Sequence, residues 1–287
     1  VEAIGEHIRQ TVAERGKQHN PVTGSGGMFI GRVLKVGEHL RAQVDIQTGD
    51  RIASLVSLSL TPLFIESVTR VDAHTGRVWI RGKAVLFESG LWAKLPDDIH
   101  HDVALAVLDV AGAPAQVRRL CKPGMNVVVI GADGKSGMLS CAQARARVGE
   151  TGKVVGIAPS ASTETATLLR EAKLVDEFIE GDARDALAMS QAVRRVLPEG
   201  ADLVVNCVNV PGTELGSILS TKDEGTVYFF SMSTSFTAAA LGAEGVGKDI
   251  TMIVGNGYAK GHAVTALQTL RDNPQIHAYF NAKYRAH

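Results

Sequence analysis

The chain has 287 residues, of which 45% are hydrophobic and 21% charged, and its 30 basic and 30 acidic side chains cancel. This composition is typical of soluble globular proteins, and the length is sufficient for two domains. Because there is no net positive charge, we expect no nucleic acid and no anionic membrane as partner, and no apolar run reaches the ~20 residues that span a bilayer.

The three cysteines, Cys121, Cys141 and Cys207, lie far apart in apolar surroundings. This odd, scattered set argues against a disulfide framework and against a four-cysteine zinc site. It fits a reducing compartment, so we expect a cytoplasmic protein. The chain begins at Val1 rather than at methionine, and we expect that upstream residues are missing.

The first third of the chain predicts a helix followed by a small β domain. Ile4, Ile8 and Val12 recur at helical spacing, which predicts an amphipathic helix over residues 1–19. From Gly24 to about Pro96, short β-prone runs alternate with turn signals, which indicates a mostly antiparallel, barrel-like (GroES-like) domain. The predicted strands are 29–36, 52–58, 64–71, 77–80 and 84–87, and a helical stretch over 101–120 follows.

From Asn126 onward, strands and helices alternate. The predicted strands are 127–130, 154–157, 177–179, 203–207, 226–230 and 250–254, and helices are predicted over 164–173, 186–196, 213–220 and 262–271. Such alternation predicts an α/β fold with a Rossmann-type, doubly wound parallel sheet of about six strands. A ligand crevice is expected at the carboxyl ends of these strands.

The turn after the first of these strands carries Gly131, Gly134 and Gly137. In a dinucleotide-binding turn the first glycine bends the chain, the second admits the pyrophosphate, and the third packs helix against strand. Lys135 and Ser136 belong to this turn, and a helix-compatible segment follows over 141–147. The N-terminus of that helix would hold the phosphates. A P-loop is excluded because Val129 stands where that motif requires glycine.

The other predicted cofactor-binding residues lie at the carboxyl ends of the remaining strands: Ser160, Asn209, Ser231, Met232 and Gly255. The second strand runs out through Ala158 without the acid that normally bonds the ribose of NAD. No arginine stands there for a 2′-phosphate, since Arg170 is a helix away. Ser160 or Ser162 could bond either cofactor, so NAD and NADP both remain open.

The order of a β domain, a helical bridge and a Rossmann domain resembles the medium-chain dehydrogenase/reductase superfamily. The superfamily pattern Gly-His-Glu-x-x-Gly falls on Gly24 to Gly31, where Ser25 replaces the zinc-binding histidine and Gly26 the glutamate. The bridge helix has no cysteine, and a catalytic zinc needs three protein ligands. We therefore expect no metal.

Longer segments resemble one family within this superfamily, the L-erythro-3,5-diaminohexanoate dehydrogenases. They are Asn20–Met28, Leu58–Leu63, Leu108–Gln116, Gly134–Met138, Gly225–Met232 and Gly255–Tyr258. The resemblance implies NAD(P)-dependent oxidative deamination of a small diamino acid in lysine fermentation. A zinc-independent quinone or enoyl reductase, and a nicotinamide-binding protein without turnover, remain as alternatives.

Deamination requires a proton-transfer group near the nicotinamide and anionic groups for the substrate ammonium. Asp109 is the first catalytic candidate, because an acid in the apolar bridge stretch is expected to have a purpose; a helix cap or ion pair is the competing explanation. Glu88, at a predicted strand end, is the second, although a solvated acid would look the same. Lys94 and Lys260 are candidates for the substrate carboxylate.

We divide the chain into a substrate domain (1–110), a Rossmann domain (111–260) and a C-terminal helix packing back on the domain interface (261–287). The last predicted strand is continuously apolar and should form an edge of the sheet. Because bare apolar edges are normally paired or covered, we expect a homodimer or homotetramer.

Overall fold

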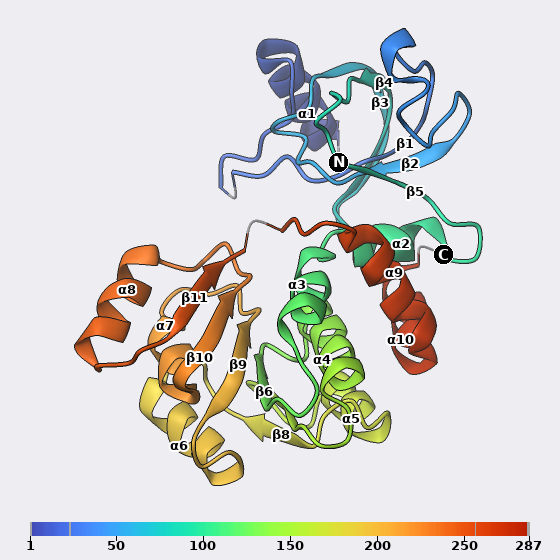
Figure 1. The fold of residues 1–287 in the computed structure, drawn as a ribbon. Coiled ribbons are helices and arrows are strands. Elements are labelled where there is room, and N and C mark those ends of the chain that lie inside the picture. Colours follow the sequence, from blue (N-terminus) through green and yellow to red (C-terminus); the bar gives the residue numbers. More distant parts are fainter. Residues whose placement is uncertain (1, 23, 256, 286–287) are drawn as a thin grey trace. The chain divides into compact units, whose positions relative to one another are not determined.

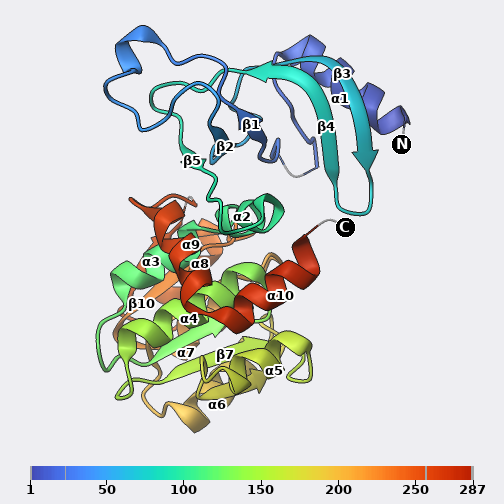
Figure 2. The same cartoon turned by 90° about the vertical axis from the view of Figure 1, so that its right-hand side faces the viewer.

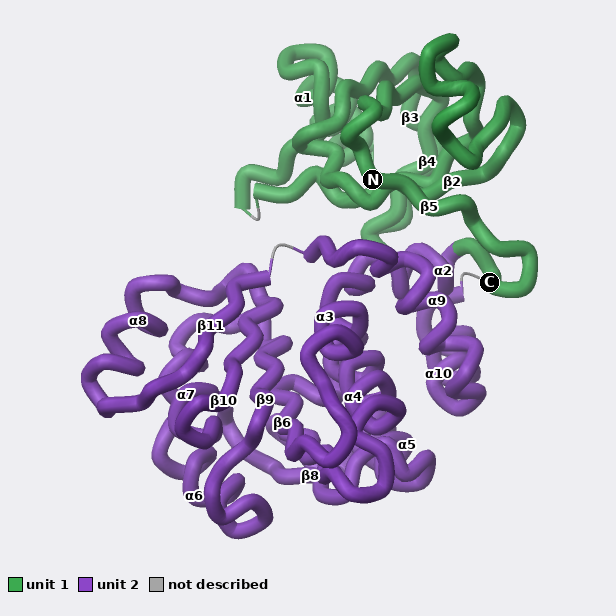
Figure 3. The backbone as a smooth tube through the Cα atoms, viewed as in Figure 1, with its two compact units in different colours: residues 1–101 green, residues 102–287 purple. Residues whose placement is uncertain are grey.

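The computed structural model describes residues 2–22, 24–255 and 257–285, and the chain divides into two compact units, 1–101 and 102–287 (Figure 3). No described helix is long and apolar enough to cross a membrane.

Unit 1 contains one helix and two small antiparallel sheets. Helix α1 (Glu2–Arg15) packs on strand β3 (Leu63–Asp72), which pairs with β4 (Arg77–Ala84). Strands β1 (Ile30–Arg32), β2 (Arg51–Ser54) and β5 (Trp92–Lys94) form a three-stranded sheet, and a 3-10 turn, η1, spans Glu38–Leu40. The predicted strand 84–87 is wrong, because β4 ends at Ala84, and β5 was not predicted.

Unit 2 is a Rossmann domain, which confirms the predicted six-stranded parallel sheet. Its strands are β6 (Val127–Ile130), β7 (Val154–Ala158), β8 (Glu177–Glu180), β9 (Ala201–Asn206), β10 (Thr221–Phe229) and β11 (Thr251–Val254). They lie in the order β11-β10-β9-β6-β7-β8, and every pairing is parallel. The order reverses between β6 and β9, which is where such sheets open a ligand crevice.

Helices cover both faces of this sheet (Figures 1 and 2). One group consists of α3 (Gly112–Leu120), α4 (Lys135–Val148), α5 (Glu164–Glu171) and α9 (His262–Asp272). The other consists of α6 (Ala186–Val196), α7 (Glu214–Ser220) and α8 (Phe236–Gly245). Helix α2 (His101–Leu108) precedes α3, and α10 (Pro274–Tyr284) follows α9; α8 and α10 were not predicted.

The core of unit 2 lies where the strands meet α6. Val128, Ile130, Val204 and Phe229 are almost completely buried and form one cluster with Met189 and Val193 of α6. Strands buried on both faces read as continuous apolar runs, which is why β6 is Val-Val-Val-Ile.

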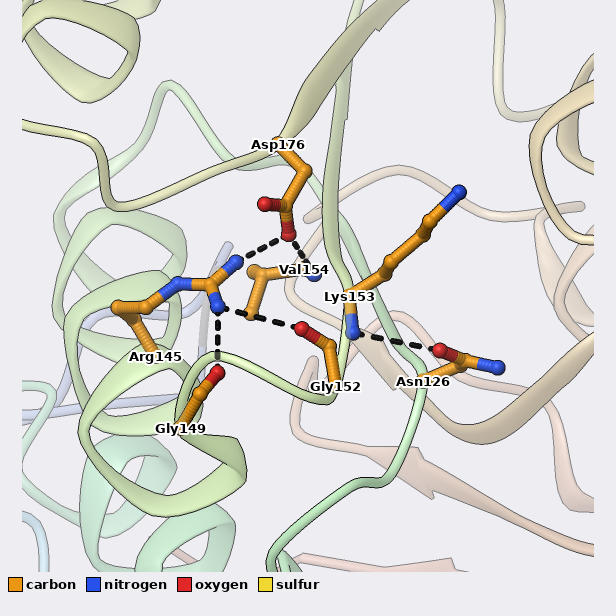
Figure 4. Close-up of polar contacts among 7 residues, drawn as sticks. All are labelled: Asn126, Arg145, Gly149, Gly152, Lys153, Val154 and Asp176. Atoms are coloured by element: carbon orange, nitrogen blue, oxygen red, sulfur yellow. Dashed lines mark hydrogen bonds and ion pairs between the residues drawn. The ribbon is translucent and has the colours of Figure 1, made fainter.

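The amino edge of the sheet is closed by a polar network around Arg145 (Figure 4). The guanidinium donates to the carbonyls of Gly149, at 2.7 Å, and Gly152, at 3.2 Å, and pairs with Asp176. The same Asp176 oxygen accepts the Val154 N–H at 2.7 Å. These bonds fix the turns at the amino edge of the sheet.

Candidate active site at the carboxyl edge of the sheet

The glycine turn begins where β6 leaves the core. Gly131 has φ of 79°, a left-handed conformation that favours glycine, and its N–H donates to the Ile157 carbonyl at 2.8 Å. The Gly134 N–H closes the turn onto the Gly131 carbonyl at 3.2 Å. The chain therefore reverses within three residues and enters α4 directly.

The other two glycines of the turn differ in the space around them. A Cβ on Gly137 would lie 2.0 Å from the Gly131 carbonyl oxygen, so only glycine lets α4 pack this closely on the end of β6. A Cβ on Gly134 would meet nothing nearer than 3.5 Å, and its φ is −84°. Gly137 is thus required by packing, whereas Gly134 leaves an open face beside the helix N-terminus.

The N-terminus of α4 has the character of an anion site. Gly134 occupies the cap position, and no side chain caps the helix. The first amides of a helix have no intrahelical acceptor, and they carry the positive end of the helix dipole. Together with the open face at Gly134, these groups fit the diphosphate of a dinucleotide.

Asp109 and Lys135 are brought together. The helical stretch predicted over 101–120 breaks between α2 and α3, and Asp109 lies in this break. Its carboxylate accepts from the Lys135 ammonium at 2.7 Å, with the two side chains 51% and 30% exposed. The pair places an acid beside the glycine turn without leaving its charge uncompensated.

Asn209 and Ser231 also meet at this edge, in one hydrogen-bond network. The Asn209 amide oxygen accepts from Ser231 Oγ at 3.4 Å and from Ser233 Oγ at 2.9 Å. Ser231 is buried, whereas the neighbouring Met232 is 91% exposed. The fully buried Asn206 anchors this loop. Its amide oxygen accepts the Val208 N–H at 3.0 Å, and its amide nitrogen donates to Thr213 Oγ1 at 2.8 Å.

Gly255 starts the loop between β11 and α9. Its N–H donates to the Phe229 carbonyl at 2.8 Å, and a Cβ there would strike the Tyr228 ring at 2.6 Å. Further along the loop, the backbone of Gly257 packs on Gly112. A Cβ on Gly112 would lie 2.4 Å from the Gly257 carbonyl oxygen. This contact brings the loop against the start of α3, next to the turn that carries Asp109.

The same loop contains an aromatic pair that the sequence did not reveal. The rings of Tyr258 and His262 meet edge to face, with centroids 5.2 Å apart. Burial lowers the pKa of His262, so its imidazole is neutral at pH 7. Its contact with Tyr258 depends on the path of the loop, which has no sequence signature.

Ser160 lies in the loop after β7, and this loop is fixed by two charged residues. The Ala161 N–H donates to the Glu180 carboxylate at 3.0 Å, and Arg170 donates to the Ala161 carbonyl at 2.7 Å. Arg170 lies in the last turn of α5, as the sequence indicates, and its side chain reaches back to this loop. Ser160 Oγ and Ser162 Oγ are hydrogen-bonded to each other at 2.9 Å.

Two of the cysteines of unit 2 are in the protonated form, Cys207 directly after β9 and Cys121 directly after α3. Burial raises the pKa of Cys207 to about 11 and that of Cys121 to about 12. At neutral pH both are protonated, and the thiolate is the reactive form.

Two predicted residues belong to unit 1. Glu88 is exposed and lines a shallow hollow with Phe87 and Ser89. Lys94 is paired with Asp50 at 3.0 Å, and this hydrogen bond raises the pKa of Lys94. Glu88 and Asp109 are therefore parts of different units.

Gly26, which stands at the glutamate position of the superfamily pattern, lacks room for a side chain. A Cβ on Gly26 would lie 2.3 Å from the backbone nitrogen of Ser59 and 2.8 Å from the Gln18 carbonyl oxygen. The Gly26 N–H donates to Ser57 Oγ at 2.8 Å, which fixes this close approach. The glutamate of the superfamily pattern does not fit here. Thr23 and Asn256, members of two resembling segments, lie outside the described residues.

Comparisons with known proteins match both units. Residues 1–96 match the family model described as the L-erythro-3,5-diaminohexanoate dehydrogenase N-terminal domain. The L-erythro-3,5-diaminohexanoate dehydrogenase of Acetoanaerobium sticklandii is 51% identical over 98% of this chain and 81% of its own length. The enzyme of the same name from Fusobacterium nucleatum is 50% identical over 99% of this chain and 82% of its own.

A solved structure shares the fold at much lower identity. The mycobacterial Rv1454c, solved in complex with NADPH, superposes with a TM-score of 0.55 and 19% identity, over 90% of this chain and 71% of its own. At this identity the likeness concerns the fold alone.

Proposed function

Since the chain belongs to the L-erythro-3,5-diaminohexanoate dehydrogenase family, we propose that it catalyses the NAD(P)-dependent oxidative deamination of L-erythro-3,5-diaminohexanoate. The products are 5-amino-3-oxohexanoate, ammonium and the reduced cofactor, and the reaction belongs to lysine fermentation. The observation that carries this proposal is identity of about half the residues over nearly the whole chain. It favours this activity over a quinone or enoyl reductase.

The cofactor site is proposed at the carboxyl edge of unit 2. Gly131, Gly134 and Gly137 form the turn, and Lys135, Ser136 and the first amides of α4 face the diphosphate. Ser160, Asn209, Ser231, Met232 and Gly255 complete the rim. When bound, the nicotinamide accepts a hydride from the substrate.

The chemistry at the substrate carbon determines what the protein must supply. The C3 ammonium first loses a proton, and C3 then loses a hydride to give an iminium group. Water adds to the iminium carbon, and departure of ammonia leaves the ketone, so that one water is consumed and one ammonium released. Each proton transfer needs a group within hydrogen-bond reach of the substrate nitrogen or of the attacking water.

We assign this proton-transfer role to Asp109 and recognition of the remote ammonium to Glu88. Asp109 is held by Lys135 at 2.7 Å, so its orientation is fixed while half of its side chain stays accessible. Glu88 is an exposed carboxylate, the type of group that pairs with an ammonium. In this division, residues 1–110 bind substrate and residues 111–260 bind cofactor.

We further propose that the enzyme needs no metal, acts in the cytoplasm and is a homodimer or homotetramer. The lack of space at Gly26 supports the first point. The three cysteines are free, as in a reducing compartment. Strand β11 is the outermost strand at one side of the described sheet, where a second copy could pair.

The test is incubation of the protein with L-erythro-3,5-diaminohexanoate and either NAD or NADP, with and without a chelator, while nicotinamide reduction and ammonium release are followed. We expect both products in equal amounts and no effect of the chelator. Cofactor binding without turnover of this substrate would contradict the proposed activity. Turnover of a quinone or an enoyl substrate instead would assign the reductase function.

A further inference from the structure

The end of β7 lacks the group that normally recognises the adenosine ribose. In Rossmann domains an acid at this position accepts the ribose hydroxyls of NAD. Here the strand ends at Ala158, and Pro159 follows. The acid is therefore missing from its usual strand, and a replacement would have to come from a neighbouring element.

Glu180 ends the adjacent strand, β8, and stands level with Ala158. The register pairs Ala158 with Glu180, and the Gly181 N–H continues the ladder to the Ala158 carbonyl at 3.0 Å. Paired strands are ~4.8 Å apart, a gap that a glutamate side chain spans. The carboxylate does reach across, because its Oε2 accepts the Ala161 N–H at 3.0 Å.

We propose that Glu180 supplies, from β8, the ribose-binding acid that β7 lacks, and that the site therefore prefers NAD to NADP. This inference rests on the proposed cofactor site. The carboxylate uses one oxygen on the loop amide, and a second oxygen remains to accept from a ribose hydroxyl. A carboxylate is an acceptor only, so it suits a hydroxyl and repels a 2′-phosphate.

Arg170 does not reverse this preference. Its guanidinium donates to the carbonyl of Ala161, the residue whose N–H is bound by Glu180. The two charged groups thus hold the two peptide groups that flank the Ala161 Cα. The Arg170 guanidinium also lies 5.7 Å from the Phe178 ring centroid. A 2′-phosphate approaching Arg170 would come close to the Glu180 carboxylate, and their repulsion opposes the attraction of the cation.

The two serines of the loop do not discriminate between NAD and NADP. Ser160 Oγ and Ser162 Oγ bond each other at 2.9 Å, and Ser160 Oγ also accepts the Ser162 N–H at 3.3 Å. A hydroxyl donates or accepts with little preference, so it serves a ribose hydroxyl and a phosphate equally. The carboxylate is the group in this loop that discriminates between them.

The test compares the binding of NADH and NADPH to the full chain by their nicotinamide fluorescence, without substrate. For the unaltered protein we expect a lower Kd for NADH. In Glu180→Gln the amide oxygen still holds the Ala161 N–H, but the negative charge is gone. We expect NADH to bind about tenfold more weakly, and the ratio of the two Kd values to move towards NADPH by tenfold or more.

Glu177→Gln is the matched control. Glu177 is an exposed glutamate on the same strand and pairs with Val155 at the amino end of the sheet. The substitution therefore removes the same negative charge, but far from the proposed ribose site. It should leave both Kd values unchanged. Glu180→Asp, which keeps the charge, should keep the preference for NADH.

The outcomes separate this inference from the proposed function. A preference of the unaltered protein for NADPH, or an unchanged ratio in Glu180→Gln, would overturn the role of Glu180 and leave the dehydrogenase proposal standing. Failure of the unaltered protein to bind either nucleotide would overturn both. If Glu180→Gln does not fold, the ratio measured with Glu180→Asp decides, since a shift towards NADPH in that variant contradicts the charge argument.

Discussion

At the scale of single residues, the proton-transfer role proposed for Asp109 can be tested apart from its ion pair with Lys135. Asp109→Asn keeps the shape of the side chain but removes the base, so we predict a fall in kcat of about 100-fold. Because both side chains are partly exposed, losing the pair should cost stability only about 1 kcal/mol or less. Steady-state kinetics and urea denaturation measure the two effects separately.

Asp182→Asn is the control for this prediction. Asp182 is a half-exposed acid, 52% accessible, paired with Arg184 at 2.6 Å, so the substitution breaks a similar ion pair outside the proposed catalytic residues. It should change kcat by less than twofold. An Asp109→Asn enzyme as active as this control would show that Asp109 serves only to hold Lys135.

Lys173 has a conformation that glycine adopts more easily. Its φ is 53°, and it ends α5 in a Schellman motif, with the Leu174 N–H donating to the Leu169 carbonyl at 2.9 Å. Lys173→Gly removes the steric cost of a Cβ in the left-handed region, and we predict a gain of about 0.5–1 kcal/mol in unfolding free energy. Urea denaturation should show a higher midpoint with an unchanged slope.

Glu171→Gly, in the last turn of the same helix, should have the opposite sign. There glycine only adds conformational freedom to the unfolded chain, and the loss should be about 1 kcal/mol. Shifts of the two midpoints in the same direction would refute the role given to the positive φ of Lys173.

At the scale of elements, two glycines of the turn between β6 and α4 have different roles, one in the stability of the fold and one in nucleotide binding. In Gly137→Ala the new Cβ would stand 2.0 Å from the Gly131 oxygen, so α4 must move away from the sheet. We predict a loss of about 3 kcal/mol of stability together with the loss of nucleotide binding. Thermal denaturation and a titration with NADH measure the two.

Gly134→Ala is the matched substitution three residues earlier. Its Cβ fits at 3.5 Å from the nearest atom, and its φ suits alanine, so the fold should keep its stability. The methyl group nonetheless enters the open face beside the helix N-terminus, and we predict NADH binding at least tenfold weaker. Equal loss of stability in both variants would contradict this distinction.

The sequence predicts the elements whose pattern is local. The Rossmann order follows from strands and helices that alternate with clear periodicity, and α6 has the predicted bounds. Strand β5 has only three residues, too few for a period of two to be recognised. Helix α8 is rich in alanine and glycine, so it has no distinct apolar stripe. Helix α10 did carry a signal, since Ile276, Tyr279 and Phe280 are spaced for one buried face.

The residues of the candidate site that the sequence does not predict are neighbours only through strand register or through a turn of the chain. The glycine turn is visible because its members lie within seven residues. Glu180 is more than twenty residues from Ala158 in sequence and becomes its neighbour only because β8 pairs with β7 in this alignment. Similarly, Asp109 and Lys135 meet only after the break between α2 and α3 turns the chain.

For the whole molecule, the open edge at β11 makes the oligomeric state testable. The Gly255 N–H points to β10, where it bonds the Phe229 carbonyl, and alternate residues of a strand direct their N–H groups to opposite sides. The Val254 N–H therefore faces the open edge, and Val254 is 57% exposed. Exposed Phe236 and Leu241 of the nearby α8 add apolar surface that a second copy could cover.

We predict that Val254→Pro converts the oligomer to smaller species, because proline removes an N–H that pairs with a second copy and spares the bonds to β10. Val254→Thr, which keeps both the N–H and the β-branched shape, should retain the native size. Sedimentation velocity over a range of protein concentrations measures the outcome. If the two variants sediment alike, and their denaturation curves show both to be folded, assembly does not use this edge, and the exposed residues of α8 become the next candidates for the interface.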